Sequence, residues 1–207
     1  MRDPGRESVA LVVGWQAFGD DDRILHVLTP TEGRSAVFVR GGQRRSHGLD
    51  VGVRANITVR GRRDGMGTLV RAEVQDARIH VRNSYARLAM MQYACALVGA
   101  FVHEGHAEPR QFALLETTLL VLDACSADPS RALLAAVELK VLTFAGVAPA
   151  VLRAIPRLER LRQARLVEIV DDPLDADAES LVYDAVREQL GHELGARALV
   201  SGIDWPR

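Results

Sequence analysis

The chain has 207 residues, 48% of them hydrophobic, which is enough to bury a sizeable core in one or two domains. Its formal net charge is −1, but residues 1–87 carry 15 arginines against 10 acids, whereas residues 88–207 carry 11 basic residues against 17 acids. Residues 1–8 are polar and the most apolar run, residues 88–102, is too short to cross a bilayer, so the sequence predicts a cytoplasmic protein without a membrane partner.

The first 80 residues contain five short runs that alternate between apolar and polar side chains. These runs are residues 8–15, 23–28, 35–39, 51–61 and 68–74. In the fourth run, one face is apolar and holds Val53, Ala55, Ile57 and Val59. Short strands with no helical period between them predict a small antiparallel barrel. An OB-fold and an SH3-like barrel would give nearly the same pattern, which does not separate them.

The hydrophobic period changes to that of helices near Arg82. Helices are predicted over about residues 83–102, 109–125, 128–146 and 180–199. Prolines interrupt the pattern within residues 147–179, and the acidic stretch 171–179 is most simply a solvated loop. The predicted class is therefore α+β, with a barrel domain over residues 1–80 and an α-helical domain over residues 81–207.

A basic segment follows the third predicted strand, where Arg40, Arg44 and Arg45 surround two glycines. Glycines let a backbone approach a polyanion closely, and guanidinium groups bind phosphate through two donors. We predict that the barrel's arginines line one face as a groove for nucleic-acid phosphates; this set is Arg34, Arg40, Arg44, Arg45, Arg54, Arg60, Arg62, Arg63 and Arg71. The alternative is a solvated, arginine-rich loop on an ordinary barrel.

Aromatic side chains are sparse in the predicted barrel, which has only Trp15, Phe18 and Phe38. Proteins that bind single strands usually stack bases on aromatic rings. The sequence therefore predicts binding dominated by the phosphate backbone, with little stacking and little sequence preference.

Motifs for catalysis or metal binding are missing from the sequence, which predicts a binding protein with no cofactor and no enzymatic activity. His103 and His106 lie beside acids but lack the HExxH order, so a solvated polar segment is the simpler interpretation and a metal-dependent hydrolase is the rival. Cys95 and Cys125 fall in separate helical stretches and form no CxxC pair, so no metal site is predicted.

Several motifs, taken in order, resemble the DNA repair and recombination protein RecO family. They are GDDDRI at 19–24, TPTEGR at 29–34, VRGGQR at 39–44, GTLVRAE at 67–73 and VELKVLTFAG at 137–146. The resemblance implies an N-terminal OB-fold followed by a helical domain. It also implies a bacterial, nucleoid-associated recombination mediator without catalytic residues. Such a protein binds single- and double-stranded DNA, anneals complementary strands, and acts with RecR and single-stranded-DNA-binding protein to load RecA.

The sequence departs from this family in three places. The four cysteines of the family's zinc module are missing, so the module is predicted to be absent. The sequence leaves open whether residues 147–179 fold as a degenerate remnant of that module. Gln43 replaces an arginine of the basic segment. Ala135 and Ala136 occupy positions that are often basic, so weak binding of the acidic tail of single-stranded-DNA-binding protein is expected. The residues predicted for that contact are Arg131, Leu133, Leu134, Val137 and Lys140. The alternative function is an OB-fold interaction module that docks an acidic partner without annealing DNA.

Overall fold

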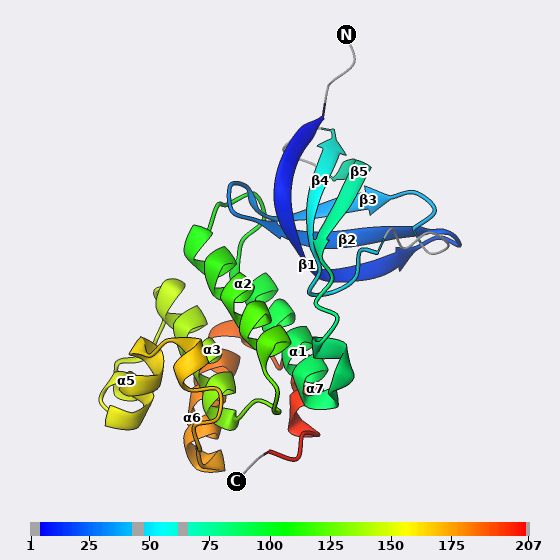
Figure 1. Cartoon of the computed structure of the whole chain (residues 1–207). Coiled ribbons are helices and arrows are strands. Elements are labelled where there is room, and N and C mark those ends of the chain that lie inside the picture. Colours follow the sequence, from blue (N-terminus) through cyan, green and yellow to red (C-terminus); the bar gives the residue numbers. More distant parts are fainter. Residues whose placement is uncertain (1–4, 43–47, 62–65, 206–207) are drawn as a thin grey trace. The chain divides into compact units, whose positions relative to one another are not determined.

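A computed structural model of the chain describes residues 5–42, 48–61 and 66–205 (Figure 1). Its first part is a closed barrel of five strands, β1 (Arg6–Phe18), β2 (Asp22–Thr29), β3 (Gly33–Val39), β4 (Arg54–Arg60) and β5 (Gly67–Asp76). The strands follow one another around the barrel in the order β1-β2-β3-β5-β4. All pairings are antiparallel except that of β3 with β5. This Greek-key order is that of an OB-fold, which confirms the predicted barrel and excludes the SH3-like alternative.

The barrel core follows from the alternation in the sequence. Val53, Ala55, Ile57 and Val59 are buried, as the pattern of the fourth run predicts. They join alanine, valine and leucine side chains from β1, β2 and β3 in one apolar cluster. The fourth strand is shorter than predicted, because residues 51 and 52 form a turn before β4 begins at Arg54. β1 is longer than predicted, since it continues to Phe18.

The second part of the chain is helical. It comprises η1 (Val81–Asn83), α1 (Tyr85–Phe101), α2 (Pro109–Ala124), α3 (Arg131–Phe144), α4 (Ala150–Arg153), α5 (Pro156–Gln163), η2 (Leu166–Glu168), α6 (Ala176–Leu190) and α7 (Arg197–Ser201). α3 is apolar on all sides and contacts α1, α5 and α6, so every residue from Ala132 to Leu139 is buried. The first three predicted helices are confirmed. Within residues 147–179, where prolines interrupt the sequence pattern, the first α-helix is α4, which has a single turn.

The predicted helix over residues 180–199 is wrong at both ends. α6 begins earlier, because the Asp175 carboxylate accepts a hydrogen bond from the Ala178 backbone N–H at 2.7 Å and caps the helix. α6 ends at Gly191, whose φ of 72° is a left-handed conformation that stops a helix. The acidic stretch 171–179 is consequently only partly a loop, and Glu179 on α6 is buried.

Contacts divide the chain into two compact units. The barrel unit contains the residues up to Arg78 together with Val102–Ala113, and the helical unit contains the rest. The segment after α1 joins the barrel unit because the Gly105 N–H donates to the Arg34 carbonyl at 3.0 Å. Among the described residues, no helix has the length and apolar character needed to cross a membrane.

Candidate nucleic-acid interface

Two phenylalanines meet on the outside of the barrel. Phe18 ends β1 and Phe38 lies near the end of β3, with ring centroids 5.7 Å apart and ring planes at 90°. The Phe18 side chain is 52% exposed, and Phe38 is half-buried. Side chains on alternate positions of β3 share a face, so Phe38 points away from the core residues Val37 and Val39. The perpendicular rings therefore present aromatic surface to solvent.

Strand register places polar and basic side chains beside this pair. Phe38 pairs with Thr68 of β5, and Thr68 pairs in turn with Arg60 of β4. Thr68 and Arg60 are both exposed. Arg40 follows β3 directly and is also exposed. We call the surface formed by Phe18, Phe38, Thr68, Arg60 and Arg40 the aromatic face.

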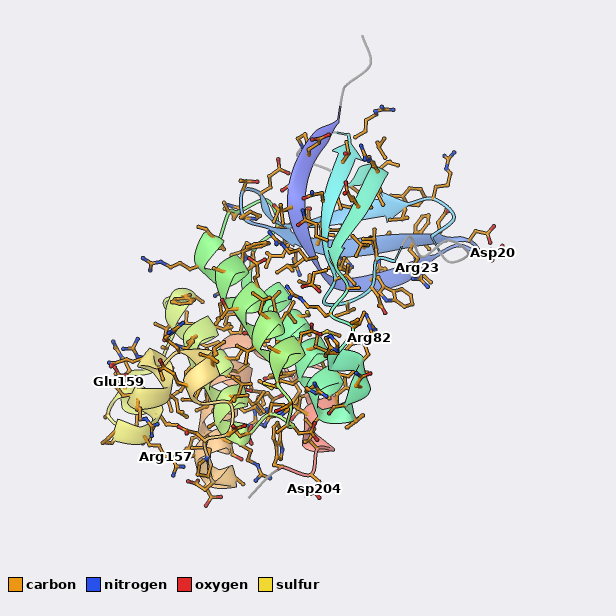
Figure 2. All side chains as sticks on the ribbon, in the orientation of Figure 1. Asp20, Arg23, Arg82, Arg157, Glu159 and Asp204 are labelled. Carbon is orange, nitrogen blue, oxygen red and sulfur yellow. The ribbon has the colours of Figure 1, made fainter. Side chains whose placement is uncertain are left out.

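The third aromatic residue of the barrel lies elsewhere. Trp15 is an odd number of residues from Phe18, so its side chain lies on the opposite face of β1. The Arg23 guanidinium of β2 stacks on the Trp15 ring, 4.1 Å from its centroid. Figure 2 labels Arg23 and Asp20 at the end of the β1–β2 hairpin. This end is acidic, with Asp20, Asp21 and Asp22 in sequence, and the Asp22 carboxylate accepts a hydrogen bond from the Gly41 N–H at 2.7 Å.

The structure separates the described arginines that the sequence predicts for one groove. Arg40 and Arg60 belong to the aromatic face. Arg54 is half-buried and lies six residues from Arg60, roughly 20 Å along β4. Arg71 is exposed, but one of its guanidinium nitrogens is 3.7 Å from the Glu73 carboxylate. The predictions for Arg44, Arg45, Arg62 and Arg63 concern positions outside the described residues.

Arg34 lies on the same side of β3 as Phe38, roughly 13 Å away along the strand. Its backbone pairs with that of Glu104 in the segment between α1 and α2. Nearby on β2, burial lowers the pKa of His26, and the positive charge of Arg34 lowers it further, while Glu104 acts in the opposite direction. Arg34 is thus placed among titratable neighbours that form a patch distinct from the aromatic face.

The TPTEGR motif has a structural role in the turn between β2 and β3. The Glu32 N–H donates to the Thr29 hydroxyl at 3.1 Å. Gly33 has a φ of 69°, and a Cβ at this position would lie 1.8 Å from the backbone oxygen of His106. The motif therefore fixes the close approach of the segment after α1 to the barrel.

A hollow of about 760 Å³ opens beside this turn, and none of the predicted arginines that the structure describes lines it. Its walls include apolar Ile57 and Met66 together with the acids Glu7, Glu32 and Glu104. The Arg6 guanidinium lies 3.4 Å from the Glu32 carboxylate, which leaves the lining with an excess of acids. Such a lining does not favour a phosphate ligand.

The two histidines that suggested a hydrolase lie in the segment beside the hollow. The His103 and His106 ring centroids are 6.3 Å apart, and both residues are exposed. In the part of the chain that the structure describes, no three His, Cys, Asp or Glu side chains form a group that could hold a metal ion.

The structure does not place the predicted tail-binding residues around an exposed pocket. Leu133, Leu134 and Val137 are at most 1% exposed and belong to the core of the helical unit. The Lys140 ammonium donates to the Arg162 carbonyl at 2.6 Å, and burial lowers its pKa. Arg131 is half-buried, with its guanidinium 5.8 Å from the Trp205 ring centroid. The three apolar side chains cannot serve as pocket walls where they stand.

The sequence pattern did not predict a buried ionic cluster in the helical unit. Glu138 of α3 is fully buried, and it accepts hydrogen bonds from the Tyr93 hydroxyl at 2.5 Å and from Arg197 at 3.1 Å. Arg197 also binds the Glu179 carboxylate and lies 4.0 Å from the Tyr183 ring centroid. Burial raises the pKa of Glu138 to about 8. The available signal was a single acid, Glu138, within the otherwise apolar stretch of residues 132–139.

The second missed feature is the aromatic pair itself. The first strand predicted from the sequence ends at residue 15, whereas β1 continues to Phe18 and brings its ring to Phe38.

Comparisons with known proteins give a family for both parts of the chain. Residues 6–78 match the family model described as Recombination protein O N terminal, and residues 82–155 match the one described as Recombination protein O C terminal. The chain is 35% identical over 123 residues to the DNA repair protein RecO of Pelobacter propionicus, which covers 58% of this chain and 50% of that protein.

Two further relatives carry the same name. The chain is 31% identical over 144 residues to the protein of Symbiobacterium thermophilum, covering 67% of this chain and 56% of the relative. It is 30% identical over 144 residues to that of Myxococcus xanthus, covering 68% of this chain and 58% of the relative. These matches span between half and three fifths of the relatives' length. Since the two family models together match well over half of the chain, in the order found in the fold, the chain belongs to the RecO family.

Proposed function

We propose that this chain acts in DNA repair as a recombination mediator that binds DNA through its barrel. The observation that carries the proposal is a closed OB-fold barrel whose outer surface presents exposed Arg40 and Arg60 beside a pair of aromatic rings. OB-folds bind oligonucleotides on the face formed by their second and third strands, and β3 supplies Phe38 to that face. Membership of the RecO family supports the same role.

The finer steps of this function follow from the family resemblance. The protein binds single- and double-stranded DNA, anneals complementary strands, and acts with RecR and single-stranded-DNA-binding protein to load RecA. It works by binding, without catalysis. Annealing needs a protein that can bind and release either strand. Weak contacts to phosphates meet this need, because they do not depend on a particular base.

Engagement of the acidic tail of single-stranded-DNA-binding protein is part of the proposal, but it is not assigned to particular residues. Leu133, Leu134 and Val137 are buried, and Lys140 is bonded to the Arg162 carbonyl. The acidic tail would therefore have to bind other apolar residues of the helical unit.

The test is the salt dependence of DNA binding. Replacement of Arg40, Arg44 and Arg45 by alanine should weaken binding and flatten the plot of log affinity against log salt. Each phosphate that the variant no longer neutralises should reduce the slope by roughly 0.7 on single strands and 0.9 on duplex. The matched control is a triple alanine variant of Arg153, Arg157 and Arg160, which are exposed on the helical unit.

Two outcomes oppose the proposal. An unchanged salt slope in the Arg40, Arg44 and Arg45 variant would contradict a DNA site on the barrel. Equal slopes in this variant and in the control would contradict it as well. Binding of an acidic peptide by the wild type without any binding of DNA would instead favour the alternative function, an interaction module for an acidic partner.

A further inference from the structure

We infer that Phe18 and Phe38 form a stacking platform for unpaired bases, so that the barrel distinguishes single-stranded from double-stranded DNA. This inference rests on the proposed function and deepens it. It also replaces the expectation from the sequence that stacking would contribute little.

The first support is the exposure of the pair. The barrel core is formed by apolar side chains on the inner face, and Phe18 and Phe38 are not among them. Phe18 is 52% exposed on a regular strand, and its described aromatic partner is Phe38. A single exposed apolar residue is common, but two phenylalanine rings in contact on the ligand side of an OB-fold provide the surface that a base can cover.

The second support is the geometry of the rings. Because the planes are perpendicular, a base that lies flat on one ring meets the edge of the other. Aromatic rings attract one another in both the offset-stacked and the edge-to-face arrangement. A corner of this kind accepts any of the four bases, since each base has a π-face.

The third support is the position of positive charge. Thr68 lies beside Phe38 and Arg60 lies beside Thr68, so Arg60 is two strands from the platform, roughly 10 Å between backbones. The long arginine side chain can bridge part of this distance and reach the phosphate of a nucleotide whose base lies on Phe38. Arg40 provides a second exposed cation two residues from Phe38.

The acidic end of the β1–β2 hairpin limits the path of the strand. Asp20 is exposed there, and Asp21 and Asp22 follow it. Asp22 pairs directly with Phe18, and its carboxylate accepts a hydrogen bond from the Gly41 N–H. Because carboxylates repel phosphates, the backbone of a bound strand is directed toward the Arg60 side of the phenylalanines.

Single-strand preference follows from the chemistry of stacking. In a duplex, each base is already stacked on its neighbours and paired to its partner, so no face is free for Phe18 or Phe38. An unpaired base can turn out and cover the rings. Phosphate contacts are available to both forms of DNA, whereas the platform serves only one.

The test compares two ligands with the whole chain of 207 residues. The ligands are a labelled oligothymidylate of about 16 nucleotides, which matches the upper site size of one OB-fold, and a duplex of similar length. Phe18→Ala and Phe38→Ala should each lower affinity for the oligothymidylate roughly 5- to 150-fold. Affinity for the duplex should change less than about twofold, and the salt slope should stay constant because neither variant alters a phosphate-binding group.

The matched control is Phe144→Ala, which removes an exposed phenylalanine from α3 of the helical unit and should leave both affinities unchanged. Phe38 is half-buried, so its variant is accompanied by a melting curve. Phe18→Trp provides the conservative replacement: it should keep the affinity for oligothymidylate, and its indole fluorescence should be quenched when the single strand binds.

The outcomes separate the inference from the function on which it rests. Equal losses on single strand and duplex, or no loss in Phe18→Ala, would overturn the platform while DNA binding by the barrel still stands. Absence of binding of either ligand by the wild type would overturn the proposed function itself.

Discussion

The apolar cluster inside the barrel and the core of the helical unit differ in the charge that they contain. The barrel core cluster consists of alanine, valine, leucine and isoleucine, and exposed arginines such as Arg40 and Arg60 lie outside it. The helical unit instead buries Glu138 and Glu179 and joins them through Arg197. Arg40 and Arg60 are therefore accessible to a ligand. In the helical unit, the cluster of Glu138, Arg197 and Glu179 instead holds helices together.

This difference has a physical basis. A small barrel closes around aliphatic side chains that need no polar partner, so arginines can be placed on its outer surface at little cost in stability. Charges in a helical core must be paired or neutralised, because an isolated buried charge is strongly unfavourable. Arg197 comes from α7, Glu179 from α6 and Glu138 from α3, so the cluster ties the C-terminal helices to the central one.

The largest expected effect on stability is that of removing the partly buried Arg197. Arg197→Met should lower the free energy of unfolding by about 3–5 kcal/mol, because Glu179 and Glu138 lose their positive partner in the core. The control is Arg187→Met on α6, where an exposed guanidinium pairs with Asp184 at 2.9 Å and should contribute less than about 1 kcal/mol. Urea unfolding of both variants measures the difference. Similar losses in the two would show that the cluster is not a structural tie.

A smaller effect is expected at the turn of the barrel. Gly33→Ala places a Cβ against the backbone oxygen of His106, whereas Gly41→Ala has a similar φ of 64° and meets no atom within 4 Å. Both variants adopt a strained left-handed backbone, at about 1–2 kcal/mol. The clash should add about 1–3 kcal/mol to Gly33→Ala alone. Chemical denaturation measures both, and equal destabilisation would mean that the segment after α1 is not held tightly against β3.

Local sequence pattern was sufficient for most of the elements, and insufficient for several of their ends and for the contacts between them. Alternation identified the buried face of β4, because side-chain period is a property of a single strand. It could not show that β1 continues to Phe18, which depends on pairing with β2. It also could not show that α6 ends at Gly191, because the apolar pattern continues on both sides of this glycine.

The candidate sites show the same limit. The arginines were visible in the sequence, and the rise along β4 separates Arg54 from Arg60. Only register, however, places Arg60 beside Thr68, the neighbour of Phe38. Leu133 and Leu134 were expected to line a pocket because they are apolar and near basic residues. They are buried because α3 is surrounded by other helices. Which face of an apolar helix is covered is decided by elements distant in the sequence.

The last expected effect is the pH dependence of stability that Glu138 contributes. Burial raises the pKa of this carboxyl from its ordinary value of 4.5 to about 8 in the folded protein, with Arg197 and the Tyr93 hydrogen bond acting in the opposite direction and Glu179 in the same one. Between these two pH values the folded protein keeps the proton that the unfolded chain has lost. The contribution of Glu138 to the free energy of unfolding must therefore fall as the pH rises through this window, by at most about 1.4 kcal/mol per pH unit.

Glu138→Gln removes this titration while keeping an acceptor for Tyr93 and Arg197. We expect the variant to lose stability less steeply than the wild type as the pH rises from about 5 to 8, with the two curves parallel below pH 4.5. Denaturant titrations of both proteins across this range measure the difference in slope, in which every other titrating group cancels. Parallel curves over the whole range would show that Glu138 is ionised in the fold. The cluster would then be a buried triad of three charges in place of an Arg197–Glu179 pair beside a neutral carboxyl.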